Sequence, residues 1–426
     1  MNYKKTKLKN GLRIITVPMK GTETVTVMVM VGVGSRFETE KEAGISHFIE
    51  HMMFKGTQKR PNYLDIAEEL DSVGGESNAY TGKDRTAYYA KVDAKHIDTA
   101  LDVISDIFLN SKFDEDEIKK ESGAIIQEIN MYEDVPMRNV GELFEGLLYW
   151  DNPLGRYIAG SKKTVASLKR KNFINYVSRF YLANDTVVCV AGKFNDKSVI
   201  RKVEKYFSSM EKGDKPEAKN VEERQEKPSM KIKFKKTDQT HLVLGVRAYP
   251  EDHKDRYILK VMSVILGGNM SSRMFSEIRE KRGLAYYVHT NVEAYSDCGY
   301  IETSVGVEHK NVNLAIQTIL GEYKKISIEK VGEKELKKAK EYIKGTAVMH
   351  LESSDAVASF FITQEIKRKK IMTQEEIFDK IDKVTPNDIV RVAKNIFVDS
   401  KLNLAIIGPH KNKAELQALL KLNSYK

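Results

Sequence analysis

Cysteine is scarce in this sequence. Only two of the 426 residues are cysteines, Cys189 and Cys298, and they lie far apart in the chain. Two distant thiols cannot build the disulfide framework typical of small secreted domains. Cys189 lies in an apolar run, and we expect it to be a small buried side chain. The cysteine content therefore favours a reducing compartment, and we predict a cytoplasmic protein.

Long apolar runs are also absent. The first residues include several lysines but no apolar stretch of the kind that a secretory signal requires, and no segment is long enough to span a bilayer. The nine prolines and 26 glycines are too few for long disordered or collagen-like tracts. With 41% hydrophobic and 31% charged residues, the composition is that of a globular protein without a membrane span.

The net charge of +10 is the one compositional feature that could indicate nucleic-acid binding. The lysines and arginines are, however, spread among 60 acidic residues, and no zinc finger, RNA-recognition motif or basic region is present. A solvated surface of mixed charge explains the composition better. We therefore expect no nucleic-acid partner.

The hydrophobic periodicity predicts a mixture of strands and helices. We expect strands at 7–17, 23–33, 76–80, 85–92, 186–191, 231–235, 241–246, 300–307 and 402–407. We expect helices at 44–54, 61–73, 96–109, 114–132, 140–148, 171–181, 257–266, 311–324, 332–351 and 385–397. The alternation within 23–33 is typical of a strand with one face in a core.

This pattern occurs twice along the chain. Val92–His96 resembles Val305–His309, and Phe173–Lys193 resembles Asp388–Pro409. We infer an α+β fold of two homologous α/β-sandwich halves, each a mixed, mainly antiparallel sheet covered by helices, in a clamshell arrangement. The charged, proline-containing stretch 213–228 is the best linker candidate. The predicted domains are a metal-binding half at 1–212, the linker at 213–228 and a closing half at 229–426.

The segment His47-Phe48-Ile49-Glu50-His51 has the spacing of a metal site. In a helix, residues i, i+3 and i+4 share one face, so His47, Glu50 and His51 lie together. Two imidazoles can hold zinc, and a carboxylate that is not a ligand can take a proton from water activated by the metal. The order H-x-x-E-H is the inverse of the common H-E-x-x-H zinc motif. Two ordinary histidines on a helix are the alternative interpretation.

A catalytic zinc site needs a third protein ligand. The acidic candidates downstream are Glu117, Glu121, Glu128 and Glu133. Glu121 and Glu128 are seven residues apart, which places them on one face of a helix. The corresponding positions in the second half are not acidic, and the helix expected at 257–266 contains neither histidine nor glutamate. Only the first half is therefore expected to bind metal.

The stretches His47–Thr57 and Glu121–Asp134, together with the duplication, resemble the M16 (pitrilysin/insulysin) metallopeptidases over nearly the whole chain. The resemblance is greatest to the short members, the mitochondrial processing peptidase subunits and their bacterial relatives. The resemblance to the family implies a Zn²⁺-dependent peptidase with His47 and His51 as ligands and Glu50 as general base. It further implies that Glu128, 77 residues after His51, is the third ligand and that Glu121 orients a histidine.

Two further motifs match the family. The segment Gly74–Tyr80 resembles an edge strand on which Asn78 and Ala79 would pair with the substrate backbone. The segment Arg279–Tyr286 resembles a motif of the second half, in which Arg279 would hold the substrate and Tyr286 would stabilise the oxyanion. The neighbouring Tyr287 leaves the choice of tyrosine open. A turn residue, a surface ion pair and a core aromatic are the alternative interpretations of Asn78, Arg279 and Tyr286.

The resemblance implies a zinc endopeptidase that cleaves extended or unstructured peptides inside a closed chamber, as a processing peptidase does. Short family members pair two chains, and this chain carries both the metal motif and the Arg279–Tyr286 segment, so we expect a homodimer. The alternative is a non-catalytic scaffold related to the core subunits of respiratory complexes. The intact H-x-x-E-H motif argues against it, because such subunits usually lose their ligands.

Overall fold

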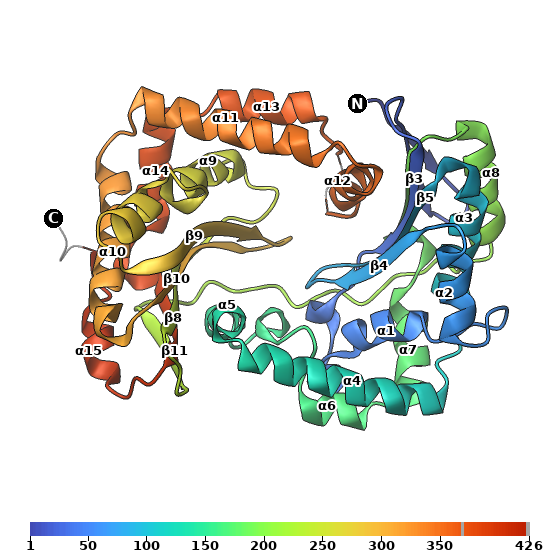
Figure 1. The fold of residues 1–426 in the computed structure, drawn as a ribbon, viewed down its shortest axis with the longest axis horizontal. Helices are drawn as coiled ribbons and strands as arrows, with labels where there is room; N and C mark the ends of the chain where they lie inside the picture. The colour runs from blue at the N-terminus through green and yellow to red at the C-terminus, as the bar shows by residue number, and fades with distance from the viewer. Residues whose placement is uncertain (368–369, 423–426) are drawn as a thin grey trace. The chain divides into compact units, whose positions relative to one another are not determined.

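The computed structural model describes residues 1–367 and 370–422. The chain forms two compact units, and each is built from three separate stretches of sequence. Unit 1 comprises 1–130, 156–219 and 347–373, and unit 2 comprises 131–155, 220–346 and 374–426. Each unit has its own sheet (Figure 1) and its own hydrophobic core.

The sheet of unit 1 has six strands in the order β1-β2-β6-β3-β5-β4. All neighbours are antiparallel except β2 and β6, which are parallel. The strands are β1 (Lys4–Lys7), β2 (Arg13–Pro18), β3 (Thr24–Val31), β4 (Glu76–Thr81), β5 (Thr86–Asp93) and β6 (Thr186–Gly192). The strand expected at 7–17 is thus a hairpin of β1 and β2, whose turn contains Asn10-Gly11.

Helices pack into the core on one face of this sheet. They are α1 (Ile45–Met53), α2 (Tyr63–Asp71), α3 (Ile97–Asn110), α4 (Glu115–Asp134), α6 (Lys162–Ser167), α7 (Arg170–Phe180) and α8 (Asp196–Phe207). The predicted helices at 44–54, 61–73, 96–109, 114–132 and 171–181 are confirmed to within two residues at each end. Helices α6 and α8 were not predicted.

The other face of the same sheet is covered by α12 (Ser354–Lys367), a helix from the second half of the sequence (Figure 1). Along β3, Val25, Val27 and Val29 point into the first core, whereas Met28 and Met30 pack with α12. The prediction that this strand has only one face in a core is therefore wrong. The sequence alternates valine with methionine and threonine, and α12 covers the face that was expected to be free.

The sheet of unit 2 has five strands in the order β7-β11-β8-β10-β9. They are β7 (Ser229–Phe234), β8 (Thr240–Ala248), β9 (Ala285–Ala294), β10 (Gly299–Val307) and β11 (Leu402–Gly408), and only β7 and β11 pair in parallel. The core lies under α9 (Arg256–Gly267), α10 (Val312–Ile328), α11 (Glu333–His350), α13 (Gln374–Asp382), α14 (Pro386–Ile396) and α15 (Lys413–Ala418). A π-helical segment, η6 (Phe275–Glu280), precedes β9.

The opposite face of the second sheet is covered by α5 (Pro136–Leu148), which comes from the first half of the sequence. Val140, Phe144 and Leu148 of this helix pack against Val243 of β8 and Ile407 of β11. Each half of the chain thus contributes one helix to the unit formed mainly by the other half. The contiguous domains expected at 1–212 and 229–426 differ from the compact units by these exchanged segments.

The mixed α/β architecture with two homologous halves is confirmed. The order of strands is the same in the two sheets if β2, β6, β3, β5 and β4 are matched with β7, β11, β8, β10 and β9. Within the described residues, no helix is both long enough and apolar enough to cross a membrane.

Candidate metal centre

Helix α1 positions the three polar residues of the H-x-x-E-H motif because its apolar residues occupy the opposite face. Ile45, Phe48, Ile49 and Met52 follow the i, i+3, i+4, i+7 spacing and are fully buried in the core of unit 1. The ring of Phe48 packs edge-on against Phe173 of α7, with 4.8 Å between the ring centroids. Packing of this stripe leaves the remaining face of α1 available for chemistry.

The N-terminus of α1 is fixed by Glu38, a residue that is only 2% exposed. Its Oε2 accepts a hydrogen bond from the backbone N–H of Gly44 at 2.7 Å, and its Oε1 accepts one from the N–H of Ser46 at 2.9 Å. Gly44 has φ +98°, and a Cβ there would come within 2.6 Å of the carbonyl oxygen of Ala159. A glycine is therefore required where the chain enters the helix.

The donor atoms of His47, His51 and Glu128 surround one position. The two Nε2 atoms are 3.3 Å apart, and each lies 3.6 Å from Oε2 of Glu128. Zinc lies about 2.0–2.1 Å from such ligands, so the ligand atoms of a tetrahedral site are about 3.3–3.4 Å apart. Among the described residues, this is the group of three His, Cys, Asp or Glu side chains with metal-binding spacing. The three side chains fit a zinc ion.

The protonation state of His47 also suits a metal ligand. Burial, together with the charge of His51, lowers the pKa of His47 to about 3, so its imidazole is neutral. Burial alone would lower the pKa of His51, but the hydrogen bond and negative charge of Glu121 raise it. The contact from Nδ1 of His51 to Oε1 of Glu121 measures 2.8 Å. A proton held on Nδ1 by Glu121 leaves the lone pair of Nε2 directed at the metal position.

Glu121 lies two helical turns before Glu128 on α4 and is 9% exposed. Its Oε2 accepts a hydrogen bond from Nζ of Lys55, at 2.7 Å. Burial would raise the pKa of the Glu121 carboxyl, but the bonds with His51 and Lys55 lower it to about 2. Glu121 is therefore an anion that orients His51, with Lys55 compensating its charge.

Glu50 lies on the same face of α1 and is not among the three clustered donors. Its Oε2 accepts a hydrogen bond from Oγ1 of Thr81, the last residue of β4, at 2.5 Å. Burial raises the pKa of Glu50, against the opposing effects of the Thr81 hydroxyl and of His51. A half-buried carboxylate with a raised pKa, next to a metal position, is suited to accept a proton from water.

Asn78 and Ala79 lie in β4, which is the last strand of its sheet. Asn78 pairs with Tyr89 and Ala79 with Tyr88 of β5, and β4 has no strand partner on its other side in the described residues. The side chain of Asn78 is exposed, and its Oδ1 accepts a hydrogen bond from the N–H of Ala79 at 2.8 Å. An open edge is available to an extended peptide.

Arg279 and Tyr286 belong to unit 2 and lie together on its surface. The Arg279 guanidinium stacks over the Tyr286 ring, 4.8 Å from the ring centroid, and Tyr286 is 79% exposed. Tyr287, its neighbour in β9, points to the opposite face and bonds Nδ1 of His241 at 2.9 Å. Burial raises the pKa of Tyr287. Tyr286 is thus the tyrosine of this pair that is available to a ligand.

Sequence reasoning missed three residues that support the site: Glu38, Lys55 and Thr81. Each acts through another residue, because Glu38 fixes the start of α1, Lys55 pairs with Glu121 and Thr81 bonds Glu50. Lys55 lies just after the end of α1, and its contact with Glu121 also depends on the packing of α4 against α1. The contacts of all three residues depend on the tertiary fold and leave no local pattern.

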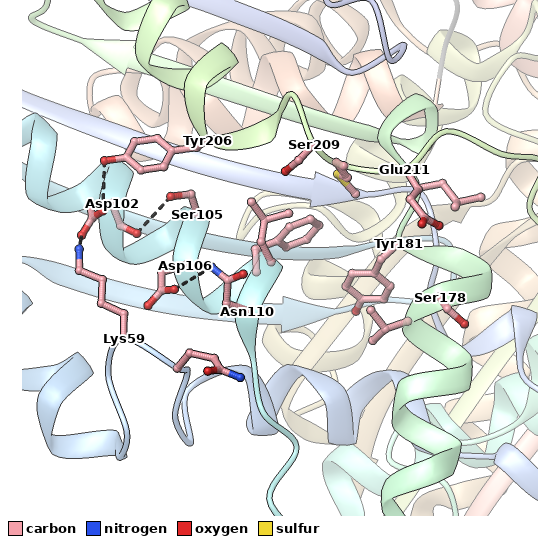
Figure 2. Close-up of a pocket in the computed structure, with 16 residues that line it drawn as sticks. Lys59, Asp102, Ser105, Asp106, Asn110, Ser178, Tyr181, Tyr206, Ser209 and Glu211 are labelled. Carbon is pink, nitrogen blue, oxygen red and sulfur yellow. Dashed lines mark hydrogen bonds and ion pairs between the residues drawn. The ribbon is translucent and has the colours of Figure 1, made fainter.

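A separate cavity of about 700 Å³ in unit 1 is lined by residues of α3, α7 and the segment after α8 (Figure 2). Its two aspartates already have partners: Asp102 binds Lys59 and the Tyr206 hydroxyl, and Asp106 binds Asn110 (Figure 2). None of its lining residues belongs to the histidine cluster. These paired carboxylates offer no open position for a metal or for proton transfer, so the chemistry of unit 1 is expected at α1 and α4.

Two family models match the chain. The model described as "Insulinase (Peptidase family M16)" matches residues 13–162, which include all the clustered donors. The model described as "Peptidase M16 inactive domain" matches residues 167–343. In the structure, the second half places α9, which has neither histidine nor glutamate, after β8, as α1 follows β3 in the first half.

Curated relatives match over almost the full length. An uncharacterized zinc protease of Bacillus subtilis, YmxG, is 37% identical over 95% of this chain and 98% of its own length. An uncharacterized zinc protease of Rickettsia felis is 37% identical over 96% of this chain and 98% of its own length. These relatives are similar to the chain in both halves.

Solved structures share the fold. The crystal structure of a protease from Helicobacter pylori superposes with a TM-score of 0.90 at 25% sequence identity, covering 96% of this chain and 99% of that one. A chain of complex III2 from Candida albicans gives a TM-score of 0.85 at 20% identity, covering 98% and 99%. The latter likeness concerns the fold alone.

Proposed function

Because the chain belongs to peptidase family M16 and is a zinc metallopeptidase, we propose that it is an endopeptidase that cleaves extended or unstructured peptides with Glu50 as general base. The observation that carries this proposal is the meeting of the His47, His51 and Glu128 donor atoms at the spacing of a tetrahedral zinc site. Glu50 lies beside them on the same face of α1.

The proposed mechanism assigns one role to each side chain. His47, His51 and Glu128 would hold a zinc ion, which when bound would supply Lewis-acid chemistry to a water and to the scissile carbonyl. The Glu50 carboxylate accepts the proton of the attacking water and then delivers it to the leaving amine. Glu121 keeps the proton on Nδ1 of His51, so that Nε2 stays free to bind the metal.

The substrate is proposed to bind as an added strand along β4. The exposed edge at Asn78 and Ala79 would supply backbone hydrogen bonds to any sequence, and an extended backbone is needed to form them. This selects unstructured peptides over folded proteins. We further propose that Arg279 holds the substrate and that Tyr286 stabilises the oxyanion, since both are exposed and in contact with each other.

The quaternary and cellular setting is also a proposal. A closed chamber, a processing role and a homodimer are each consistent with a chain that carries both the zinc motif and the Arg279–Tyr286 segment. Analytical ultracentrifugation of the zinc-loaded chain tests the homodimer. The non-catalytic scaffold is not favoured, because the donor set and the general base are all retained.

The test of the proposed function is Glu50→Gln. The amide has nearly the shape of the carboxylate but cannot accept the proton, so the variant should bind one zinc per chain and lose at least about 10²-fold in kcat. Glu117→Gln serves as the control, because Glu117 is on α4 and pairs with Lys120. A Glu50→Gln chain that cleaves a quenched peptide at the native rate would refute the mechanism.

A further inference from the structure

The hydroxyl of Thr81 connects two parts of the site that are far apart in sequence. Oγ1 of Thr81 donates a hydrogen bond to Oε2 of Glu50 at 2.5 Å, across 31 residues of chain. Thr81 is the last residue of β4, and Glu50 lies on α1. The general base and the open edge strand are thus in direct contact through one side chain.

The geometry of β4 directs this side chain toward α1. Successive residues of a strand point to opposite faces, so Ala79 and Thr81 share one face and Tyr80 occupies the other. Ala79 packs against the core that contains α1, whereas Tyr80 packs against the core under α12. The direction of the Thr81 hydroxyl therefore follows from the strand register.

The end of β4 is held firmly. Thr81 pairs with Thr86 of β5, and the turn between them is closed by a hydrogen bond from the N–H of Gly82 to the carbonyl of Arg85 at 2.8 Å. The carbonyl oxygens of Gly82 and Lys83 accept hydrogen bonds from the segment that precedes α1, at 3.1 Å each. This anchoring fixes the Thr81 backbone on the side of β5 and leaves the other edge free.

The two carboxylate oxygens of Glu50 have different surroundings. Oε2 is engaged by Thr81, while Oε1 has no hydrogen-bond partner among residues 1–367 and 370–422. A carboxylate anchored by one oxygen presents the other in a defined direction, which is the arrangement that proton transfer requires. The bond to Thr81 thus leaves Oε1 as the oxygen that can accept the proton.

We propose that Thr81 is a positioning residue, whose hydroxyl holds the Glu50 carboxylate in its proton-accepting orientation and links that orientation to the strand on which the peptide binds. This inference rests on the proposed peptidase function. A peptide added along β4 would pair with the strand that carries this hydroxyl, so the element that binds the substrate also holds the base.

The first experiment removes the hydroxyl without changing the shape of the side chain. In the zinc-loaded full chain, Thr81→Val should lower kcat about 10–100-fold for a quenched peptide that the wild type cleaves, with KM within about twofold. Zinc stoichiometry and Tm should stay at wild-type values. Thr81→Ser restores the hydroxyl and should recover most of kcat. Thr318→Val is the control, because the Thr318 hydroxyl bonds only the Leu314 carbonyl of its own helix.

The second experiment tests whether Thr81 acts through Glu50. In a Glu50→Gln background, Thr81→Val should change the residual rate by less than about twofold, because residues that act as a unit are not additive. In crystals grown without metal, the Glu50 side chain should have one orientation in the wild type and several in Thr81→Val. A further loss in the double variant, or a single unchanged orientation, would overturn the proposal.

The outcomes separate this inference from the function on which it rests. If the wild type is active, Glu50→Gln is inactive and Thr81→Val is as active as the wild type, the role of Thr81 is refuted and the peptidase stands. If Thr81→Val loses zinc, Tm and kcat together, Thr81 is structural and the proposal also fails. If the zinc-loaded wild type cleaves no peptide, the proposed function and the role of Thr81 fail together.

Discussion

The Nδ1 atom of His51 lies 2.8 Å from Oε1 of Glu121, while its Nε2 faces Glu128 at 3.6 Å. The two ends of one imidazole thus contact two glutamates that are seven residues apart on α4. One glutamate fixes the tautomer, and the other completes the donor set. This division of roles means that the two acids should respond differently to substitution.

Glu121→Ala should weaken zinc binding about 10–100-fold, because His51 loses the partner that orients it and raises its basicity. The dissociation constant can be measured by competition with a chromophoric chelator at constant pH. Glu117→Ala, one turn earlier on the same helix, removes a carboxylate that pairs with Lys120, and it should leave zinc affinity unchanged.

Glu128→Ala removes a ligand, so its zinc affinity should fall more than that of Glu121→Ala. Equal losses in the two variants would contradict the assignment of Glu128 to the metal and Glu121 to His51. Lys55→Met should give a smaller loss than Glu121→Ala, because the carboxylate that touches the imidazole remains in place.

Glu38 predicts a pH dependence of stability. Burial raises the pKa of its carboxyl to about 7, against the bonds from Gly44 and Ser46. Between pH 4.5 and about 7 the folded chain therefore retains a proton that the unfolded chain releases, so this contribution to stability falls as pH rises. The loss is at most about 3 kcal/mol.

Glu38→Gln does not titrate, so its free energy of unfolding should lack this component. Urea unfolding at several values from pH 5 to 8, with a chelator present to exclude zinc linkage, measures the difference between wild type and variant. The advantage of the wild type should shrink as pH rises. Parallel curves for the two proteins would show that Glu38 does not titrate in this range.

The exchange of α5 and α12 predicts where a core mutation acts. Phe361 of α12 is fully buried against the sheet of unit 1, although it lies in the second half of the sequence. Phe361→Ala should cost about 3–5 kcal/mol. Hydrogen exchange should show faster exchange in β3 and β6, and little change in β8 and β11, which belong to the other sheet.

Phe144→Ala is the matching substitution in α5, the helix that the first half of the sequence contributes to unit 2. Phe144 lies in the first half of the sequence but packs under β8 and β11. Its loss should increase exchange in those strands and leave β3 and β6 protected. If each mutation instead affected the sheet of its own half, the exchange of helices would be wrong.

The sequence alone predicts those features of the site that depend on the spacing of residues within one helix. The stripe of Ile45, Phe48, Ile49 and Met52 predicts which face of α1 is free, and the spacing of Glu121 and Glu128 predicts that they share a face of α4. The structure adds that Glu128 approaches the histidines and Glu121 contacts only one of them.

The remaining features depend on contacts between distant segments. Helix α12 was not predicted, because its buried residues mix apolar and polar side chains and form no clear apolar stripe, and nothing in its sequence specifies that it packs on the sheet of the first half. Strand β9 was not predicted; four of its ten residues are exposed, and only two are fully buried. The contact between Thr81 and Glu50 likewise requires the register of β4 against β5.

Tyr286 and Tyr287 provide the last prediction, because adjacent strand residues face opposite sides. Tyr286 is 79% exposed and touches Arg279, whereas Tyr287 bonds His241. If the Tyr286 hydroxyl stabilises the oxyanion, Tyr286→Phe should lower kcat about 10²–10³-fold with Tm unchanged. Tyr287→Phe should keep kcat and cost about 1 kcal/mol of stability through its lost hydrogen bond. Steady-state kinetics and thermal unfolding of both variants distinguish the two roles, and the reverse pattern would assign the oxyanion contact to Tyr287.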